Sequence, residues 1–265
     1  MDNRPIGVFD SGLGGLTVVK AIKELLPNES IIYFGDTARL PYGVKSRDLV
    51  KQFSKQITKF LLEKNAKAIV IACNTATAMA LDSLKISHKN IPIIGVIEPG
   101  AKKAIAETKT KKIGVIGTIA TISSGAYEKA IEKEDSKIEV ISKSCPLFVH
   151  FVEEGLISGT AINEIAKHYL YSFKNKADTL ILGCTHYPLL KDIIFKNTEN
   201  INLIDSASSV AEVVHRVLYN HKLLNGEKTL GGLDCYVTDL PMRFEEQGKI
   251  FFGSDISNVQ LLNEF

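Results

Sequence analysis

Short apolar runs rich in β-branched residues alternate with longer amphipathic stretches along the whole chain. Such short runs are typical of strands buried on both faces, and apolar residues spaced three and four apart indicate helices. The alternation therefore predicts an α/β fold with mainly parallel sheets. The predicted strands are Ile6–Phe9, Ile31–Phe34, Ala68–Ile71, Ile93–Val96, Ile113–Ile116, Ile138–Ile141, Thr179–Leu182 and Asn202–Ile204. The predicted helices include Thr17–Leu26, Ser46–Lys64, Ala101–Thr108, Ala161–Lys174 and Ser208–Leu224.

Two strand motifs occur twice, in the same order and at nearly the same offset. The motif Ile6–Phe9 returns as Ile113–Ile116, and Ala68–Cys73 returns as Thr179–Cys184. Apolar strands match one another by chance, but two matched offsets favour two equivalent α/β domains. In each of these domains the second repeated strand leads into a cysteine.

The composition excludes several classes of function. Net charge is +2, from 32 basic and 30 acidic residues, which predicts binding neither to nucleic acid nor to an anionic membrane. No apolar stretch approaches the roughly 20 residues that cross a bilayer, and the first apolar run is too short for a secretory signal. We therefore expect a soluble, cytoplasmic protein.

Four cysteines are present, namely Cys73, Cys145, Cys184 and Cys235. No pair has CxxC spacing and no His/Cys group has zinc spacing, so we predict free thiols and no metal site. The simplest interpretation of a free cysteine is a small buried apolar residue.

The positions of Cys73 and Cys184 indicate chemistry instead. Both follow a predicted parallel strand, and ligands of open α/β sheets bind beyond the carboxyl ends of the strands. A helix N-terminus at such an end favours the thiolate. Two thiols from facing domains could address one small ligand from opposite sides, as a racemase with two bases requires.

The glycine-rich segment Gly7–Gly15 admits another interpretation. A dinucleotide-binding fingerprint that starts at Gly12 would need Gly or Ala where this chain has Thr17. Asp36 lies near the place of a ribose-binding acid. Dinucleotide binding therefore stays open as an alternative.

Four segments, taken in order and spacing, resemble the glutamate racemase family: Gly7–Gly15, Gly35–Gly43, Cys73–Thr77 and Gly183–Leu190. The resemblance runs from Ile6 to about Phe252. It implies two pseudo-symmetric α/β domains, residues 1–97 plus 207–265 and residues 98–206, with the active site in the cleft between them. It also implies racemisation of L-glutamate to D-glutamate without a cofactor, supplying D-glutamate for peptidoglycan.

The resemblance assigns catalytic roles to five residues. Cys73 and Cys184 match the two catalytic thiols, Asp10 a carboxylate beside the first thiol, and His186 a histidine beside the second. Glu153 matches an acidic residue near the second thiol, although Glu154 adjoins it and His150 replaces a family proline nearby. Taken without the resemblance, Asp10 reads as a helix N-cap and His186 as a structural histidine.

The resemblance also implies the substrate contacts. Polar positions that would hold the α-carboxylate and ammonium groups are Ser11, Asn74, Thr75, Thr118, Thr121 and Thr185. The loop Pro41, Tyr42 and Gly43 would receive the side-chain carboxylate through its backbone amides. Asp36 is a possible auxiliary residue, and a homodimer is a further implication of the family.

The mechanism must remove a weakly acidic Cα proton. No motif marks a Schiff-base lysine for pyridoxal phosphate and no metal cluster is visible, so we predict direct deprotonation in a closed cleft, with no cofactor. Three other functional hypotheses stay open: an aspartate or hydantoin racemase of the same superfamily, a non-catalytic two-lobed binding protein, and dithiol redox chemistry.

Overall fold

The structure is a computed structural model that describes residues 1–199 and 201–262. Residues 200 and 263–265 belong to the predicted domains but lie outside the described residues. The chain forms two compact units. The first unit is Met1–Val96 with Ala207–Phe265, and the second unit is Ile97–Ser206.

The first unit is built on a six-stranded sheet in the order β10-β9-β2-β1-β3-β4, in which neighbouring strands run parallel. Its strands are β1 (Ile6–Asp10), β2 (Ile31–Gly35), β3 (Ala68–Ile71), β4 (Ile93–Gly95), β9 (Leu233–Val237) and β10 (Val259–Leu261). The central strand β1 is buried throughout, because helices cover the sheet on both faces.

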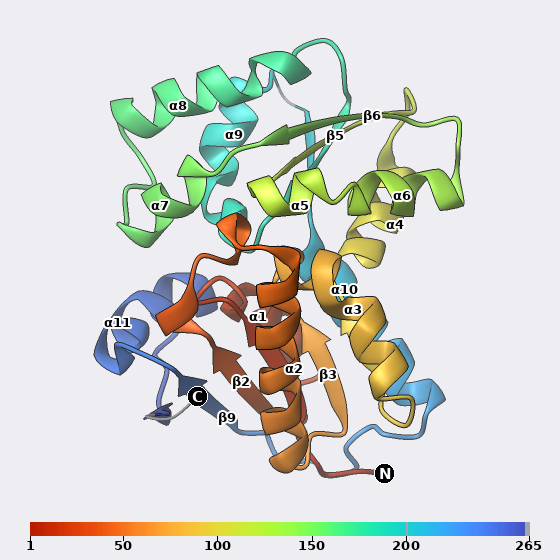
Figure 1. The fold of residues 1–265 in the computed structure, drawn as a ribbon, viewed down its shortest axis with the longest axis vertical. Helices are drawn as coiled ribbons and strands as arrows, with labels where there is room; N and C mark the ends of the chain where they lie inside the picture. The colour runs from red at the N-terminus through yellow and green to blue at the C-terminus, as the bar shows by residue number, and fades with distance from the viewer. Residues whose placement is uncertain (200, 263–265) are drawn as a thin grey trace. The chain divides into compact units, whose positions relative to one another are not determined.

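Alternation of side chains along the strands decides which helix packs where. Phe9, Phe34 and Ile71 share a buried cluster with apolar side chains of α2 (Arg47–Glu63) and α3 (Asn74–Ser87). Tyr33, the residue before Phe34 in β2, has its ring centre 5.9 Å from that of Phe244. Phe244 belongs to α11 (Pro241–Phe252), which packs against α1 (Leu16–Leu25). The helix α10 (Ser206–Asn220) leads the chain back into this unit (Figure 1).

The second unit contains a four-stranded parallel sheet in the order β6-β5-β7-β8. Its strands are β5 (Lys112–Gly117), β6 (Glu139–Ser144), β7 (Thr179–Gly183) and β8 (Asn202–Asp205). Figure 1 shows α8 and α9 on one side of this sheet and α4, α5 and α6 on the other. The helices are α4 (Ile97–Glu107), α5 (Ile119–Ser123), α6 (Ala126–Glu134), α7 (Leu147–Glu153), α8 (Thr160–Leu170) and α9 (Lys191–Asn197).

Four strands follow the same topological order in both units. Numbered along each unit, β2-β1-β3-β4 and β6-β5-β7-β8 both read 2-1-3-4. The repeated sequence motifs form the equivalent strands, β1 with β5 and β3 with β7. The connections diverge between these two central strands, and this switch point is where α/β sheets bind ligands.

The predicted α/β class with mainly parallel sheets is confirmed. Each of the eight predicted strands overlaps one of β1–β8, whereas β9 and β10 were not predicted. None of the helices in the described part of the chain combines the length and hydropathy of a membrane-spanning segment.

Candidate active site

Cys73 lies at the switch point of the first sheet, two residues beyond the end of β3. It is the N-cap of α3, and its Sγ accepts a hydrogen bond from the backbone N–H of Ala76 at 3.4 Å. The thiol also lies 3.9 Å from Ser11 Oγ, and 6% of the residue is exposed. A 14-residue helix directs its N-terminal partial positive charge at this sulfur, which favours the thiolate that a base requires.

Asp10 ends the neighbouring strand β1 and is fully buried. Its Oδ2 accepts a hydrogen bond from the backbone N–H of Gly12 at 3.0 Å. The interpretation of Asp10 as a helix N-cap is wrong, because α1 is capped by Gly15 without a side-chain bond. A Cβ added at Gly15 would lie 2.6 Å from Asp10 Cβ, so the turn needs glycine to pass this close.

Besides Ser11, which follows β1, the predicted substrate positions of the first unit lie in two groups. Asn74 and Thr75 form the first turn of α3 directly after Cys73, and both are buried. The loop Pro41, Tyr42 and Gly43 follows β2, beside β1 at the same carboxyl edge of the sheet. Tyr42 and Gly43 are buried, and a short 3₁₀ turn spans Tyr42–Val44.

The Asp36 carboxylate, also buried, accepts hydrogen bonds from the side chains of Arg39, Tyr42 and Thr238. These bonds tie Asp36 to its own loop. They do not support the dinucleotide reading, in which this carboxylate would bind a ribose.

Cys184 occupies the equivalent position in the second sheet, directly after β7. Its Sγ lies 3.8 Å from His186 Nδ1, and the opposite ring nitrogen Nε2 is hydrogen-bonded to the Glu153 carboxylate. Of the two neighbouring glutamates, Glu153 therefore makes the contact with His186. Glu153 is the last residue of α7, and the exposed His150 lies in the same helix without interrupting it.

The contacts of the His186 imidazole favour its charged form. Burial by itself lowers the pKa of His186, but the contacts with Cys184 and Glu153 outweigh burial and raise that pKa well above its ordinary value. Cys73 and Cys184 occupy equivalent strand ends, but their neighbours differ. Cys73 lies at a helix N-terminus, whereas Cys184 lies beside the His186–Glu153 pair.

Aromatic residues fix the elements that carry this pair. Tyr187 is fully buried, and its hydroxyl donates a hydrogen bond of 2.8 Å to the carbonyl of Cys145, which lies just before α7 in the chain. The rings of Tyr187 and Phe148 meet edge to face, with centroids 5.4 Å apart. Because Phe148 belongs to α7, these contacts hold α7 against the segment that carries His186. Sequence reasoning missed this role of Tyr187, although the residue lies in a motif that it singled out.

The three predicted threonines of the second unit surround the same switch point. Thr118 caps α5 after β5, and its Oγ1 accepts a hydrogen bond from the backbone N–H of Thr121 at 3.2 Å. The two threonine hydroxyls are 3.0 Å apart. Thr185 Oγ1 lies 3.5 Å from His186 Nδ1. All three residues are buried, and each has a hydroxyl that can bind a carboxylate.

The two remaining cysteines lie where burial disfavours the reactive thiolate form. Cys145 and Cys235 are fully buried. Burial raises the pKa of the Cys145 thiol and raises that of Cys235 to about 12. Neither forms a thiolate readily near neutral pH. Among the described residues no group of three His, Cys, Asp or Glu side chains could hold a metal ion.

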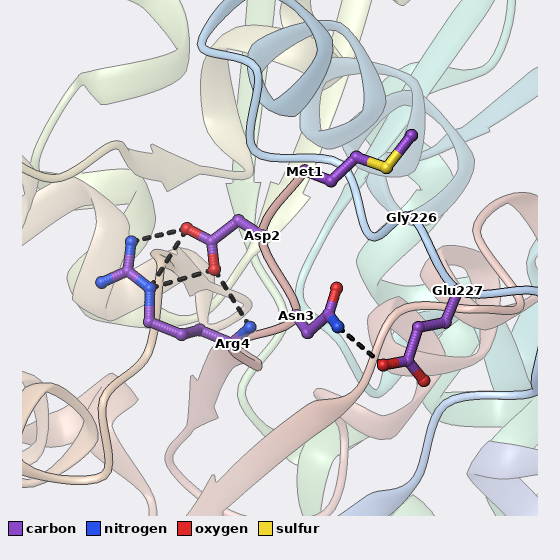
Figure 2. Close-up of a pocket in the computed structure, with 6 residues that line it drawn as sticks. All are labelled: Met1, Asp2, Asn3, Arg4, Gly226 and Glu227. Carbon is purple, nitrogen blue, oxygen red and sulfur yellow. Dashed lines mark hydrogen bonds and ion pairs between the residues drawn. The ribbon is translucent and has the colours of Figure 1, made fainter.

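A surface cavity of about 580 Å³ lies at the opposite, amino end of the first sheet (Figure 2). Asp2 and Arg4 form an ion pair of 2.6 Å on its wall, and Asn3 Nδ2 donates to Glu227 Oε1 at 2.6 Å. Met1 and Gly226 complete the lining. None of these six residues is a predicted site residue, and β1 separates them from Asp10.

Comparison with known proteins places this arrangement in a class. The model of the family described as Asp/Glu/Hydantoin racemase matches residues 6–214. The chain belongs to this family of racemases.

Within the family the chain groups with the glutamate racemases. It is 47% identical to the glutamate racemase of Aquifex aeolicus, covering 95% of each chain. It is 48% identical to that of Chlorobaculum tepidum, over 97% of this chain and 96% of the relative. The crystal structure of glutamate racemase from Francisella tularensis in complex with D-glutamate superposes with a TM-score of 0.94. That protein is 45% identical, and the match covers 99% of this chain and 98% of the other.

Proposed function

We propose that this enzyme interconverts L- and D-glutamate with two thiols as acid and base, and that the D-glutamate serves peptidoglycan synthesis. One observation carries the mechanism. Cys73 and Cys184 follow topologically equivalent strands, β3 and β7, at the switch points of two sheets with the same strand order. A pair of equivalent thiols suits a substrate whose two faces must be treated alike.

In the proposed reaction, the thiolate of one cysteine removes the Cα proton of glutamate. The electron pair left on Cα delocalises into the α-carboxylate, where neutral donors stabilise the developing charge. The thiol of the other cysteine then delivers a proton to the opposite face of the carbon. One thiol ends protonated and the other ionised, so the return reaction uses the same groups with their roles exchanged.

The neighbours of each thiol supply the proton handling. Asp10 is buried at the end of β1, which pairs with β3 ahead of Cys73, and the His186–Glu153 pair lies beside Cys184. We propose that these groups hold each thiol in the protonation state that its step requires. The two α/β units are then the two domains that contribute one thiol each.

Substrate recognition follows from the hydroxyl and amide donors of the two units. The α-carboxylate and ammonium groups would be bound by Ser11, Asn74 and Thr75 of the first unit and by Thr118, Thr121 and Thr185 of the second. Such neutral donors stabilise a carboxylate without placing a fixed cation beside the thiols. The loop Pro41–Gly43 would receive the side-chain carboxylate, which distinguishes glutamate from shorter amino acids.

The proposal is tested by incubating the purified protein with L-glutamate in deuterated water. We expect D-glutamate to form and to carry deuterium at Cα from its first appearance, while the remaining L-glutamate keeps its proton at early times. A single base would instead return label to both enantiomers or transfer the original proton. Absence of Cα exchange would exclude a racemase that acts on glutamate, and faster exchange with aspartate would reassign the substrate.

The expected homodimer rests on the resemblance to the family, and the expected cytoplasmic location rests on the short apolar runs of the sequence. Light scattering of the purified protein measures its oligomeric state. Fractionation of the source cells measures its location.

A further inference from the structure

The loop that precedes the proposed substrate-binding residues is organised around one buried carboxylate. Asp36 follows β2 directly and is fully buried. Arg39 Nε donates to both carboxylate oxygens, at 2.9 and 2.7 Å, and the Tyr42 hydroxyl donates to Oδ2. The carboxylate therefore holds Arg39, just before Pro41–Gly43, and Tyr42, within it.

The fourth hydrogen bond to this carboxylate comes from a residue 202 positions away in the chain. Thr238 Oγ1 donates to Asp36 Oδ1 at 3.0 Å and accepts a hydrogen bond from the backbone N–H of Ala38 at 2.9 Å. One hydroxyl thus links the buried carboxylate to the loop backbone. Thr238 follows β9, which pairs in parallel with β2, so both segments leave the sheet at the same edge.

The next residues form a reciprocal pair of hydrogen bonds. Thr37 Oγ1 donates to the carbonyl of Asp239 at 2.7 Å, and the backbone N–H of Asp239 donates back to Thr37 Oγ1 at 2.8 Å. We call Thr238 and Asp239 the return clamp, because they belong to the part of the chain that rejoins the first unit after residue 206.

A second set of contacts holds the same loop against α2. The Arg39 guanidinium lies 4.2 Å from the centre of the Phe53 ring, and its Nη1 donates to Gln56 at 2.7 Å. The Tyr42 ring packs against the same phenylalanine, with centroids 5.6 Å apart. The loop is therefore held from β9 on one side and from α2 on the other.

We propose that Asp36 and the return clamp are positioning residues that set the affinity for the substrate's side-chain carboxylate, an inference that rests on the proposed function. Backbone amides bind a carboxylate well only when they point to it before it arrives. If the loop samples other conformations, the apparent affinity falls by the fraction of time spent in the competent one. The Arg39 guanidinium also offsets the charge of Asp36, so this carboxylate does not repel the incoming one.

The decisive variant is Thr238→Val, which keeps the shape of the side chain and removes the hydroxyl. We expect KM for glutamate to rise about 3- to 10-fold, because the loop loses both hydrogen bonds of this hydroxyl and only part of that loss reaches the substrate, with kcat changed less than about 2-fold. The rise should appear in both directions, because both enantiomers carry the same side chain. Thr238→Ser, which keeps the hydroxyl, should restore most of the affinity.

Thr229→Val is the matched control. It makes the same substitution in the returning segment, where the hydroxyl contacts only the exposed Glu227 at 3.3 Å among the described residues. We expect its KM to equal that of the unmodified enzyme. An unchanged KM in Thr238→Val, or an equal rise in both valine variants, would overturn the proposal. If Thr238→Val does not fold, Thr238→Ala takes its place under the same criteria.

A second measurement separates this inference from the proposed function. Amide hydrogen exchange at Tyr42, Gly43 and Val44 should be faster in Thr238→Val than in the unmodified protein, whatever the substrate is. Unchanged exchange rates would refute the clamp. Failure of the unmodified protein to racemise glutamate would refute the function alone.

Discussion

The Nε2 atom of His186 is hydrogen-bonded to the carboxylate of Glu153, while the other nitrogen of the same ring lies 3.8 Å from Cys184 Sγ. The imidazole therefore connects a carboxylate to a thiol, and both partners favour its charged form. Nothing in the sequence spacing predicts this contact directly, because Glu153 and His186 lie 33 positions apart. The end of α7 and the turn after β7 bring them together.

Glu153→Gln should lower the pKa of His186, because the substitution removes the negative charge next to Nε2. We expect racemisation to fall by up to about 100-fold, since the histidine acts on the proton of Cys184 and the general acid–base effect is of this order. NMR titration of the His186 ring measures the pKa. An unchanged pKa would contradict the role of Glu153.

The same pair makes stability depend on pH. The folded-state pKa of His186 is raised, so its stabilising contribution is complete below the unfolded value of about 6.5 and is lost as pH rises through the raised folded value. We expect Glu153→Gln to reduce the free energy of unfolding by about 1.5 to 3 kcal/mol near pH 6 and by less at high pH. Urea unfolding at several pH values tests this sign.

Cys73→Ser and Cys184→Ser should each reduce racemisation by about 10²- to 10⁴-fold, because each removes one acid–base group. Each variant retains one thiol, so partial Cα proton exchange in deuterated water should persist on one face. Cys235→Ala is the control, since burial keeps that thiol protonated. Full racemisation by either serine variant would refute the two-thiol assignment.

Gly183→Ala should inactivate the enzyme by displacing Cys184. An added Cβ would lie 2.7 Å from the carbonyl oxygen of Ile116 and 3.0 Å from Tyr127 Cε2, so β7 must shift. We expect a loss of about 1 to 3 kcal/mol in the free energy of unfolding, together with loss of racemisation. Gly232→Ala is the matched control, because its Cβ meets no atom within 4 Å. Equal behaviour of the two variants would be inconsistent with the crowding at Gly183.

Tyr187→Phe should destabilise the second unit by about 0.5 to 1.5 kcal/mol, because the carbonyl of Cys145 loses one of its two donors and keeps only the backbone N–H of Phe148. Tyr171→Phe, at a residue that is 76% exposed, should leave the unfolding free energy unchanged. Urea unfolding measures both. We also expect Tyr187→Phe to lower kcat more than it raises KM, since the tyrosine holds α7 and Glu153 in place. An unaltered kcat in a correctly folded variant would argue against that positioning.

Local patterns were sufficient for the strands that carry the thiols. The eight predicted strands were recovered because each contains a short apolar run; all are buried almost throughout except β6 and β8, which are mostly half-buried. The strands β9 and β10 were missed. Leu233–Val237 contains Asp234, and Val259–Leu261 is short and mostly exposed, so neither has the continuous apolar run of the central strands.

The α/β class, the repeated strands and the positions of Cys73 and Cys184 after two of them follow from the amino-acid sequence, because these features depend on residues close together in the chain. Which distant side chains share a hydrogen bond depends on the folded arrangement of the elements. Glu153 reaches His186, and Thr238 reaches Asp36, through the packing of elements that are remote in sequence. Such contacts leave no periodic signal, because they depend on where whole helices and strands come to rest.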